Sequence, residues 1–136
     1  MVINVQGLSS APVNQALDKG RYQVLIQGAE AIVSAQKGTP GVKLEVQVTD
    51  GPEQEGGYSP VGKKIFPVIY FPEAEGQGRT IGLSRLKKLC IAAGVSPDDN
   101  LDLSELVGKE VVVRTTQREY NGELQVEVVD YYPVKL

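Results

Sequence analysis

Three strand-like runs, one helical stretch and two further strand-like runs follow one another along this 136-residue chain. Apolar and polar residues alternate in the first run, residues 21–35, where Gly28 is typical of a bulge or bend. The second run, residues 42–49, alternates most regularly. The third, residues 63–71, is apolar on both faces and contains Pro67, which has no amide hydrogen to donate. It is therefore expected to lie at a sheet edge or to carry a bulge.

A helix is predicted over residues 80–93, because apolar residues recur there at helical spacing and Gly94 is a natural C-terminal stop. The apolar stripe consists of Gly82, Leu86, Leu89, Cys90 and Ala93, with Leu83 beside it. Residues 50–62 and 72–78, before and after the third run, are polar and rich in glycine. The first of these loops is too polar to pack and long enough to be mobile.

The last two strands are predicted at residues 110–116 and 123–131, after a short helical turn at residues 103–107. The tight connection at Asn121-Gly122 fits a hairpin turn in which both residues take positive φ. Five strands with one helix between the third and the fourth are in the order of the OB-fold. We therefore expect an all-β, five-stranded Greek-key barrel over residues 20–136.

An N-terminal arm is expected over residues 1–19, with one short strand at residues 2–5. Contact with a second copy, pairing with the barrel and disorder all remain open for this arm. A chain of this length forms one domain that buries its core without a disulfide or metal. No run of about 18 apolar residues predicts a membrane helix, and the N-terminal residues lack the pattern of a secretory signal, so a cytoplasmic location is expected.

The composition argues against an enzyme or a metal site. The chain has no histidine, which removes the commonest general base and the commonest zinc ligand together. Its single cysteine, Cys90, is expected to fill the core. The loop glutamates lack the spacing of a calcium loop, and the glycine pairs precede no Gly-Lys-Ser/Thr sequence. No catalytic residue, metal or cofactor is therefore predicted.

Basic and aromatic residues occupy the places where an OB-fold holds its cargo, across strands 2 and 3 and on the loops that flank the sheet. They are Lys37, Lys43, Lys63, Lys64, Phe66, Tyr70, Arg114, Arg118 and Tyr120. Phosphates require cations and unstacked bases require flat partners, so this set predicts a surface for single-stranded nucleic acid. Phe66 fits the core as well as a stacking platform. The net charge of −3 disfavours coating of duplex DNA by a bulk positive field, but it permits a local basic groove.

Residues 22–35, 37–39, 42–48 and 62–66 resemble the start of a small phage protein family found with replication and recombination genes. The helix and residues 106–113 resemble its second half. Some members of such families are phage single-stranded DNA-binding proteins with an OB-fold. The resemblance therefore implies that fold, single-stranded DNA as partner, and phage replication or recombination proteins as further partners in the host cytoplasm. The acidic tail through which many such proteins recruit partners is not matched by residues 132–136.

Two functional hypotheses follow. The first is a non-enzymatic protein, monomeric or homo-oligomeric, that coats and protects single-stranded DNA during phage replication or recombination. The alternative is an OB-like adaptor or inhibitor that binds a host protein through acidic loops such as the one containing Asp50, Glu53 and Glu55. Replacing Lys63 and Lys64 should impair the first function, and replacing Glu53 and Glu55 should impair the second.

Overall fold

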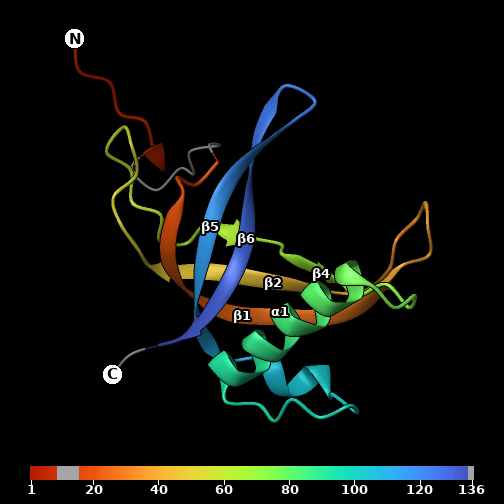
Figure 1. The fold of residues 1–136 in the computed structure, drawn as a ribbon. Helices are drawn as coiled ribbons and strands as arrows, with labels where there is room; N and C mark the ends of the chain where they lie inside the picture. Colours follow the sequence, from red (N-terminus) through yellow and green to blue (C-terminus); the bar gives the residue numbers. More distant parts are fainter. Residues whose placement is uncertain (9–15, 135–136) are drawn as a thin grey trace.

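The computed structural model describes residues 1–8 and 16–134, and from Gly20 onward the chain forms one antiparallel sheet with a long helix at one end (Figure 1). The helix α1 spans Gln77–Ala93, and a short 3₁₀ helix, η2, spans Leu103–Leu106. The six strands are β1 (Gly20–Val33), β2 (Pro40–Asp50), β3 (Lys64–Ile65), β4 (Val68–Tyr70), β5 (Glu110–Tyr120) and β6 (Glu123–Pro133).

The sheet is open, with the strand order β3-β2-β1-β5-β6 and with β4 paired to β2 beside β3. Among the described strands, no ladder joins the β3–β4 edge to β6, and that ladder is what a closed barrel requires. The predicted all-β OB-fold barrel is therefore wrong, and the fold is a mixed α/β arrangement of an open six-stranded sheet and one helix. The cause lies in the third predicted strand. It breaks at Phe66 and Pro67 into two short pieces that pair with β2 alone, so this edge offers too little regular backbone to reach β6.

Most element predictions are confirmed, although their boundaries move by a few residues. The register of β1 against β2 shifts between Ile26 and Gly28, where the bulge was expected. Asn121 and Gly122 both have positive φ at the β5–β6 turn, and this hairpin extends beyond the rest of the sheet (Figure 1). The strand predicted at residues 2–5 is wrong, because those residues form none.

The N-terminal arm was predicted to end at residue 19, and its residues 9–15 lie outside the described part of the chain. Leu17 is only 2% exposed and belongs to the core. The backbone carbonyl of Leu17 accepts a hydrogen bond of 2.9 Å from the Gln117 side chain of β5. The last residues of the predicted arm thus pack as part of the domain.

One face of the sheet forms the core together with η2 and the buried side of α1. The helix packs against β6, β4 and β5, and burial of this apolar surface is the main driving force for the fold. The fully buried side chains of this core include Tyr22, Val24, Ile26, Leu44, Val46, Val48, Leu89, Leu106, Val111, Val113 and Tyr131.

The polar loop between β2 and β3 is held in place, contrary to the prediction that it would not pack. Gln54 is only 7% exposed. Its amide nitrogen donates to the Tyr22 hydroxyl at 2.8 Å and to the Pro52 carbonyl at 2.9 Å. Its amide oxygen accepts from the Asp18 backbone nitrogen at 2.7 Å. A single buried glutamine therefore ties this loop to the start of β1.

Candidate nucleic-acid interface

Strands β3 and β4 divide their side chains between two faces. Ile65, Pro67 and Ile69 are buried, while Lys64, Phe66 and Tyr70 are exposed. The cross-strand pairing of Lys43 with Val68 brings Lys43 of β2 to the same outer face, because Val68 alternates with the buried residues. We call Lys43, Lys64, Phe66 and Tyr70 the aromatic–lysine surface. The structure thus unites four of the nine predicted site residues.

Phe66 is a surface residue, which decides between the two alternatives left by the sequence. The residue is 52% exposed. The Lys43 ammonium nitrogen lies 5.7 Å from the ring centroid, within the range of a cation–π contact. A flat apolar surface and a positive charge are therefore adjacent on this face.

Tyr70 is held against the strand beside it by a glycine. The residue is 43% exposed and pairs with Gly41 of β2. A Cβ atom at Gly41 would lie 2.9 Å from the Tyr70 Cδ1 atom, which is closer than real Cβ atoms come to their neighbours. The missing side chain thus lets the ring lie close to the β2 backbone. This supporting role of Gly41 depends on β4 lying beside β2, which the sequence around Gly41 does not indicate.

Lys64 and Lys63 add positive charge next to this face. The Lys64 ammonium lies 3.8 Å from a Glu45 carboxylate oxygen, and both side chains are about half exposed (48% and 41%). Such a surface ion pair contributes little free energy, so an anionic ligand can compete with it. Burial lowers the pKa of the Lys63 ammonium, and a nearby phosphate would favour its charged form.

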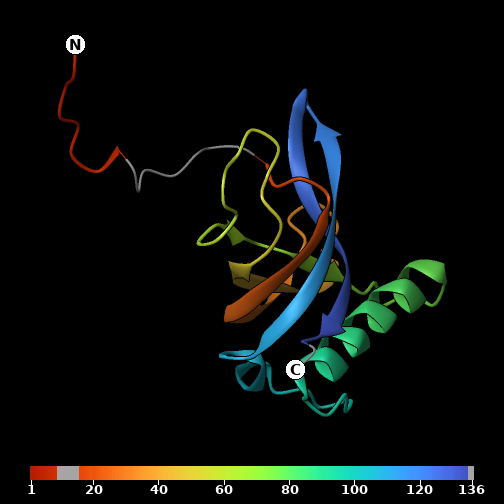
Figure 2. The same ribbon diagram turned by 90° about the vertical axis from the view of Figure 1, so that its left-hand side faces the viewer.

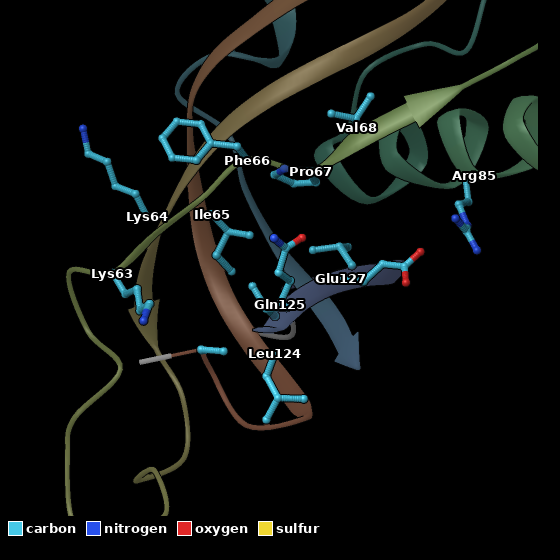
Figure 3. Close-up of a pocket in the computed structure, with 13 residues that line it drawn as sticks. Lys63, Lys64, Ile65, Phe66, Pro67, Val68, Arg85, Leu124, Gln125 and Glu127 are labelled. Atoms are coloured by element: carbon cyan, nitrogen blue, oxygen red, sulfur yellow. The ribbon is translucent and has the colours of Figure 1, made fainter. Parts of the chain in front are cut away.

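A cleft of about 400 Å³ lies between the β3–β4 edge and the facing segment of β6 (Figure 3). We call it the edge cleft. Its walls are residues 63–68 and 124–128, with Ala16 and Arg85 completing the lining. Ile65 and Gln125 face each other across it in Figure 3. Three cationic residues, Lys63, Lys64 and Arg85, and one carboxylate, that of Glu127, contribute to the lining.

The other predicted site residues lie apart from the aromatic–lysine surface. Lys37 is in the turn between β1 and β2. Arg114, Arg118 and Tyr120 are exposed on β5, and β1 separates β5 from β2 in the sheet. Of these residues, Arg118 is paired with a residue that lines the edge cleft, since its partner across the β5–β6 ladder is Gln125.

Sequence reasoning did not select Arg85, Gln125 or Glu127, which line the edge cleft. Arg85 lies outside the apolar stripe predicted for the helix, and nothing in the spacing of the sequence indicates that α1 and β6 meet at this cleft. The missing information is tertiary: which two edges of the sheet lie opposite each other.

Within residues 1–8 and 16–134, no group of three or more Cys, Asp or Glu side chains is placed to hold a metal ion. None of the helices in the same ranges is long and apolar enough to cross a membrane.

Comparison with known proteins gives a family but no activity. No curated protein matches the chain. The sequence profile of a family described as "Protein of unknown function (DUF669)" matches residues 5–135. This match carries no statement about single-stranded DNA binding, so the finer resemblance noted in the sequence stays a hypothesis. Because the matched region covers nearly the whole chain, the protein belongs to the DUF669 family.

Proposed function

We propose that this protein binds single-stranded DNA, with little sequence preference, through the aromatic–lysine surface. The observation that carries the proposal is the placement of two half-exposed aromatic rings, Phe66 and Tyr70, on one face with Lys43 beside the Phe66 ring. Every base has a flat face that can stack on such a ring, and stacking contributes about 1–3 kcal/mol per base. The phage setting, replication or recombination, rests on the sequence resemblance alone.

The charges around this surface support the same ligand. Lys43 of β2, Lys64 of β3 and Lys63, which directly precedes β3, supply cations that can contact phosphates of one strand. The net charge of −3 makes a duplex coat less favourable, because such binding depends on a broad positive field. A narrow track of lysines beside stacking rings favours a single strand, whose bases are free to leave their own stack.

The direct test is titration of a fluorescent oligothymidine of about 30 nucleotides, followed by anisotropy, with a duplex of equal length for comparison. We expect salt-sensitive binding to the single strand and much weaker binding to the duplex. Phe66→Ala and Tyr70→Ala should each weaken binding by about 5- to 150-fold, the equivalent of about 1–3 kcal/mol. Tyr58→Ala is the matched control, because Tyr58 is a partly exposed aromatic in the β2–β3 loop.

The salt dependence tests the lysines separately from the rings. Lys43→Gln and Lys64→Gln should each reduce the slope of log K against log salt by about 0.7, the value for one phosphate contact on a single strand. Lys87→Gln, on the exposed side of α1, should leave the slope unchanged. Absence of binding by the wild-type protein at low salt would overturn the proposal.

The adaptor hypothesis predicts a different pattern in the same experiment. Replacing Glu53 and Glu55 with Gln should not weaken DNA binding if the aromatic–lysine surface is the site. If the wild-type protein fails to bind DNA, the acidic loop becomes the region to test against host proteins.

A further inference from the structure

The N-terminal residues 1–8 are mostly apolar, carry no charged side chain and extend away from the sheet in both views (Figures 1 and 2). From here on, "the arm" means residues 1–8 alone and not the whole predicted arm of residues 1–19. Val2 is 98% and Ile3 67% exposed. Such a cluster of exposed apolar residues indicates a contact with another surface. The exposed apolar residues of the arm are Met1, Val2, Ile3, Val5 and Leu8.

The sequence of the arm suits an added strand. It contains three β-branched residues, Val2, Ile3 and Val5, and has no charged side chain and no proline. In an extended conformation Ile3 and Val5 lie on one face, while Asn4 and Gln6 lie on the other. One face of such a strand is therefore apolar, and the other carries Val2 together with the polar Asn4 and Gln6.

Strand β6 offers a matching edge. Among the described strands it pairs only with β5, and its residues 124–128 form one wall of the edge cleft. No proline interrupts this segment, so each of its residues carries a backbone donor and acceptor. Leu124, Val126 and Val128 line the same cleft as Ile65 and Pro67 on the opposite edge. The cleft thus combines a free strand edge with apolar side chains on both of its walls, beside the charged groups of Lys63, Lys64, Arg85 and Glu127.

We propose that the arm of one copy adds as a strand to β6 of a second copy and occupies its edge cleft. Residues 2–6 have the same number of residues as the β6 wall of the cleft, and five extended residues span about 16 Å. Main-chain hydrogen bonds to β6 provide affinity, and Ile3 and Val5 enter the apolar part of the cleft. The segment that a monomer leaves in water is thereby buried.

A second copy is the occupant favoured by the structure, because the arm points away from its own sheet in Figures 1 and 2. Each copy carries one arm and one edge cleft, so the arm of each copy can bind the cleft of the next. Lys43 and Tyr70 of the aromatic–lysine surface lie outside the edge cleft, whereas Lys64 and Phe66 belong to both. The inference rests on the arm and the β6 edge, not on the proposed DNA binding, and it is tested without DNA.

Disulfide trapping between differently labelled copies tests the contact directly. One protein carries Ile3→Cys and the other Gln125→Cys, both in a Cys90→Ala background so that no native thiol remains. Mixing them under mild oxidation should give a crosslinked heterodimer. Replacing the second partner by Gln36→Cys, at the exposed β1–β2 turn, should give little product. Equal crosslinking in the two mixtures would overturn the proposal.

The same pair of cysteines distinguishes contact between copies from contact within one chain. A single protein carrying both Ile3→Cys and Gln125→Cys should form crosslinked multimers whose yield falls on dilution. An internal disulfide that forms at all dilutions would show that the arm fills its own cleft, and the proposal would be wrong.

Sedimentation velocity over a range of protein concentrations provides a readout without added cysteines. The wild-type protein should show species larger than a monomer that increase with concentration. Ile3→Asp and Val5→Asp should shift the distribution to the monomer. Val33→Asp is the matched control, since Val33 is an equally exposed apolar residue at the end of β1 (69%), and it should behave like the wild type. A wild-type protein that stays monomeric at the highest concentration would contradict the proposal.

Discussion

Gly82 of α1 packs directly against the backbone of Tyr70 in β4. A Cβ atom at Gly82 would overlap the Tyr70 carbonyl oxygen and would lie 3.0 Å from the Cα atom of Phe71. The obstacle is backbone, which cannot rotate away as a side chain can. Close contact between the helix and β4 therefore requires a residue without a side chain at position 82, and this contact fixes the end of the strand that carries Tyr70.

Gly82→Ala should lower the free energy of unfolding by about 1–3 kcal/mol, the usual cost of inserting a methyl group into a close-packed site. An unobstructed helix position would respond in the opposite direction, since alanine favours helices over glycine by about 1 kcal/mol. Gly78→Ala supplies that comparison in the same helix, because its Cβ atom would make an ordinary contact of 3.6 Å with Pro72. Urea denaturation of both variants measures the difference. Equal stability of the two would refute the close-packing argument.

Tyr22→Phe should destabilise the protein by about 1–3 kcal/mol, because it removes a buried hydrogen-bond partner. The Tyr22 hydroxyl donates to the Asp18 carbonyl at 2.7 Å and accepts from the Gln54 amide at 2.8 Å. Cleavage after Glu53 and Glu55 by a glutamate-specific protease should also become faster, because the loop loses an anchor. Tyr58→Phe, in the same loop, is the control. Unchanged cleavage in Tyr22→Phe would show that Gln54 does not need Tyr22 to hold the loop.

Asp130 should make stability depend on pH in the acid range. Burial acts to raise the pKa of its carboxyl, but hydrogen bonds from Lys88, the Tyr131 backbone and Tyr132 outweigh this effect and lower it. The Lys88 ammonium lies 2.6 Å from the carboxylate. A pKa that is lower in the folded state stabilises the protein above the unfolded-state pKa, and this stabilisation is lost as the pH falls through the folded-state pKa.

Asp130→Asn should therefore cost about 1 kcal/mol at pH 7, and the difference from wild type should vanish in strong acid. Thermal denaturation between pH 7 and pH 2 measures it. Lys88→Gln should show a similar loss at pH 7, and the double variant should lose less than the sum of the two. Additive losses would show that the two groups do not act as a pair.

Cys90 should react with thiol reagents only when the protein unfolds. The residue is 1% exposed, and burial raises the pKa of its thiol. Since the thiolate is the reactive form, both effects slow the reaction in the native state. Modification by an aromatic disulfide reagent should be slow in buffer and rapid above the urea midpoint. Rapid reaction in buffer would mean that the C-terminal half of α1 opens readily.

The strands and the helix could be predicted because their signals are local. Alternation along β2, the positive-φ turn at Asn121-Gly122 and Gly94 at the end of α1 each depend on a few neighbouring residues. The closure of the sheet could not be predicted in the same way. Closure depends on whether the β3–β4 edge pairs with β6, two segments far apart in the sequence. The edge is split at Pro67 into two short strands and does not pair with β6.

The candidate site was likewise predicted only where its geometry depends on neighbouring residues. Lys64, Phe66 and Tyr70 are separated by even numbers of residues, so their common face could be predicted from the two-residue period of a strand. The separation of Arg114 and Tyr120 from this face depends on β1 lying between β2 and β5. That arrangement was misjudged because the expected barrel brings the final hairpin back toward the third strand.

The pairing of β1 with β5 also determines when the protein can fold. This ladder joins Gly20 to Thr115, a separation of 95 residues, and such non-local pairing is slow to form. During synthesis, the hairpin of β1 and β2 emerges long before β5 exists. The apolar face of this hairpin stays exposed until the C-terminal hairpin is made. A nascent chain that stalls before residue 110 therefore exposes the apolar side chains of β1 and β2 and is vulnerable to aggregation.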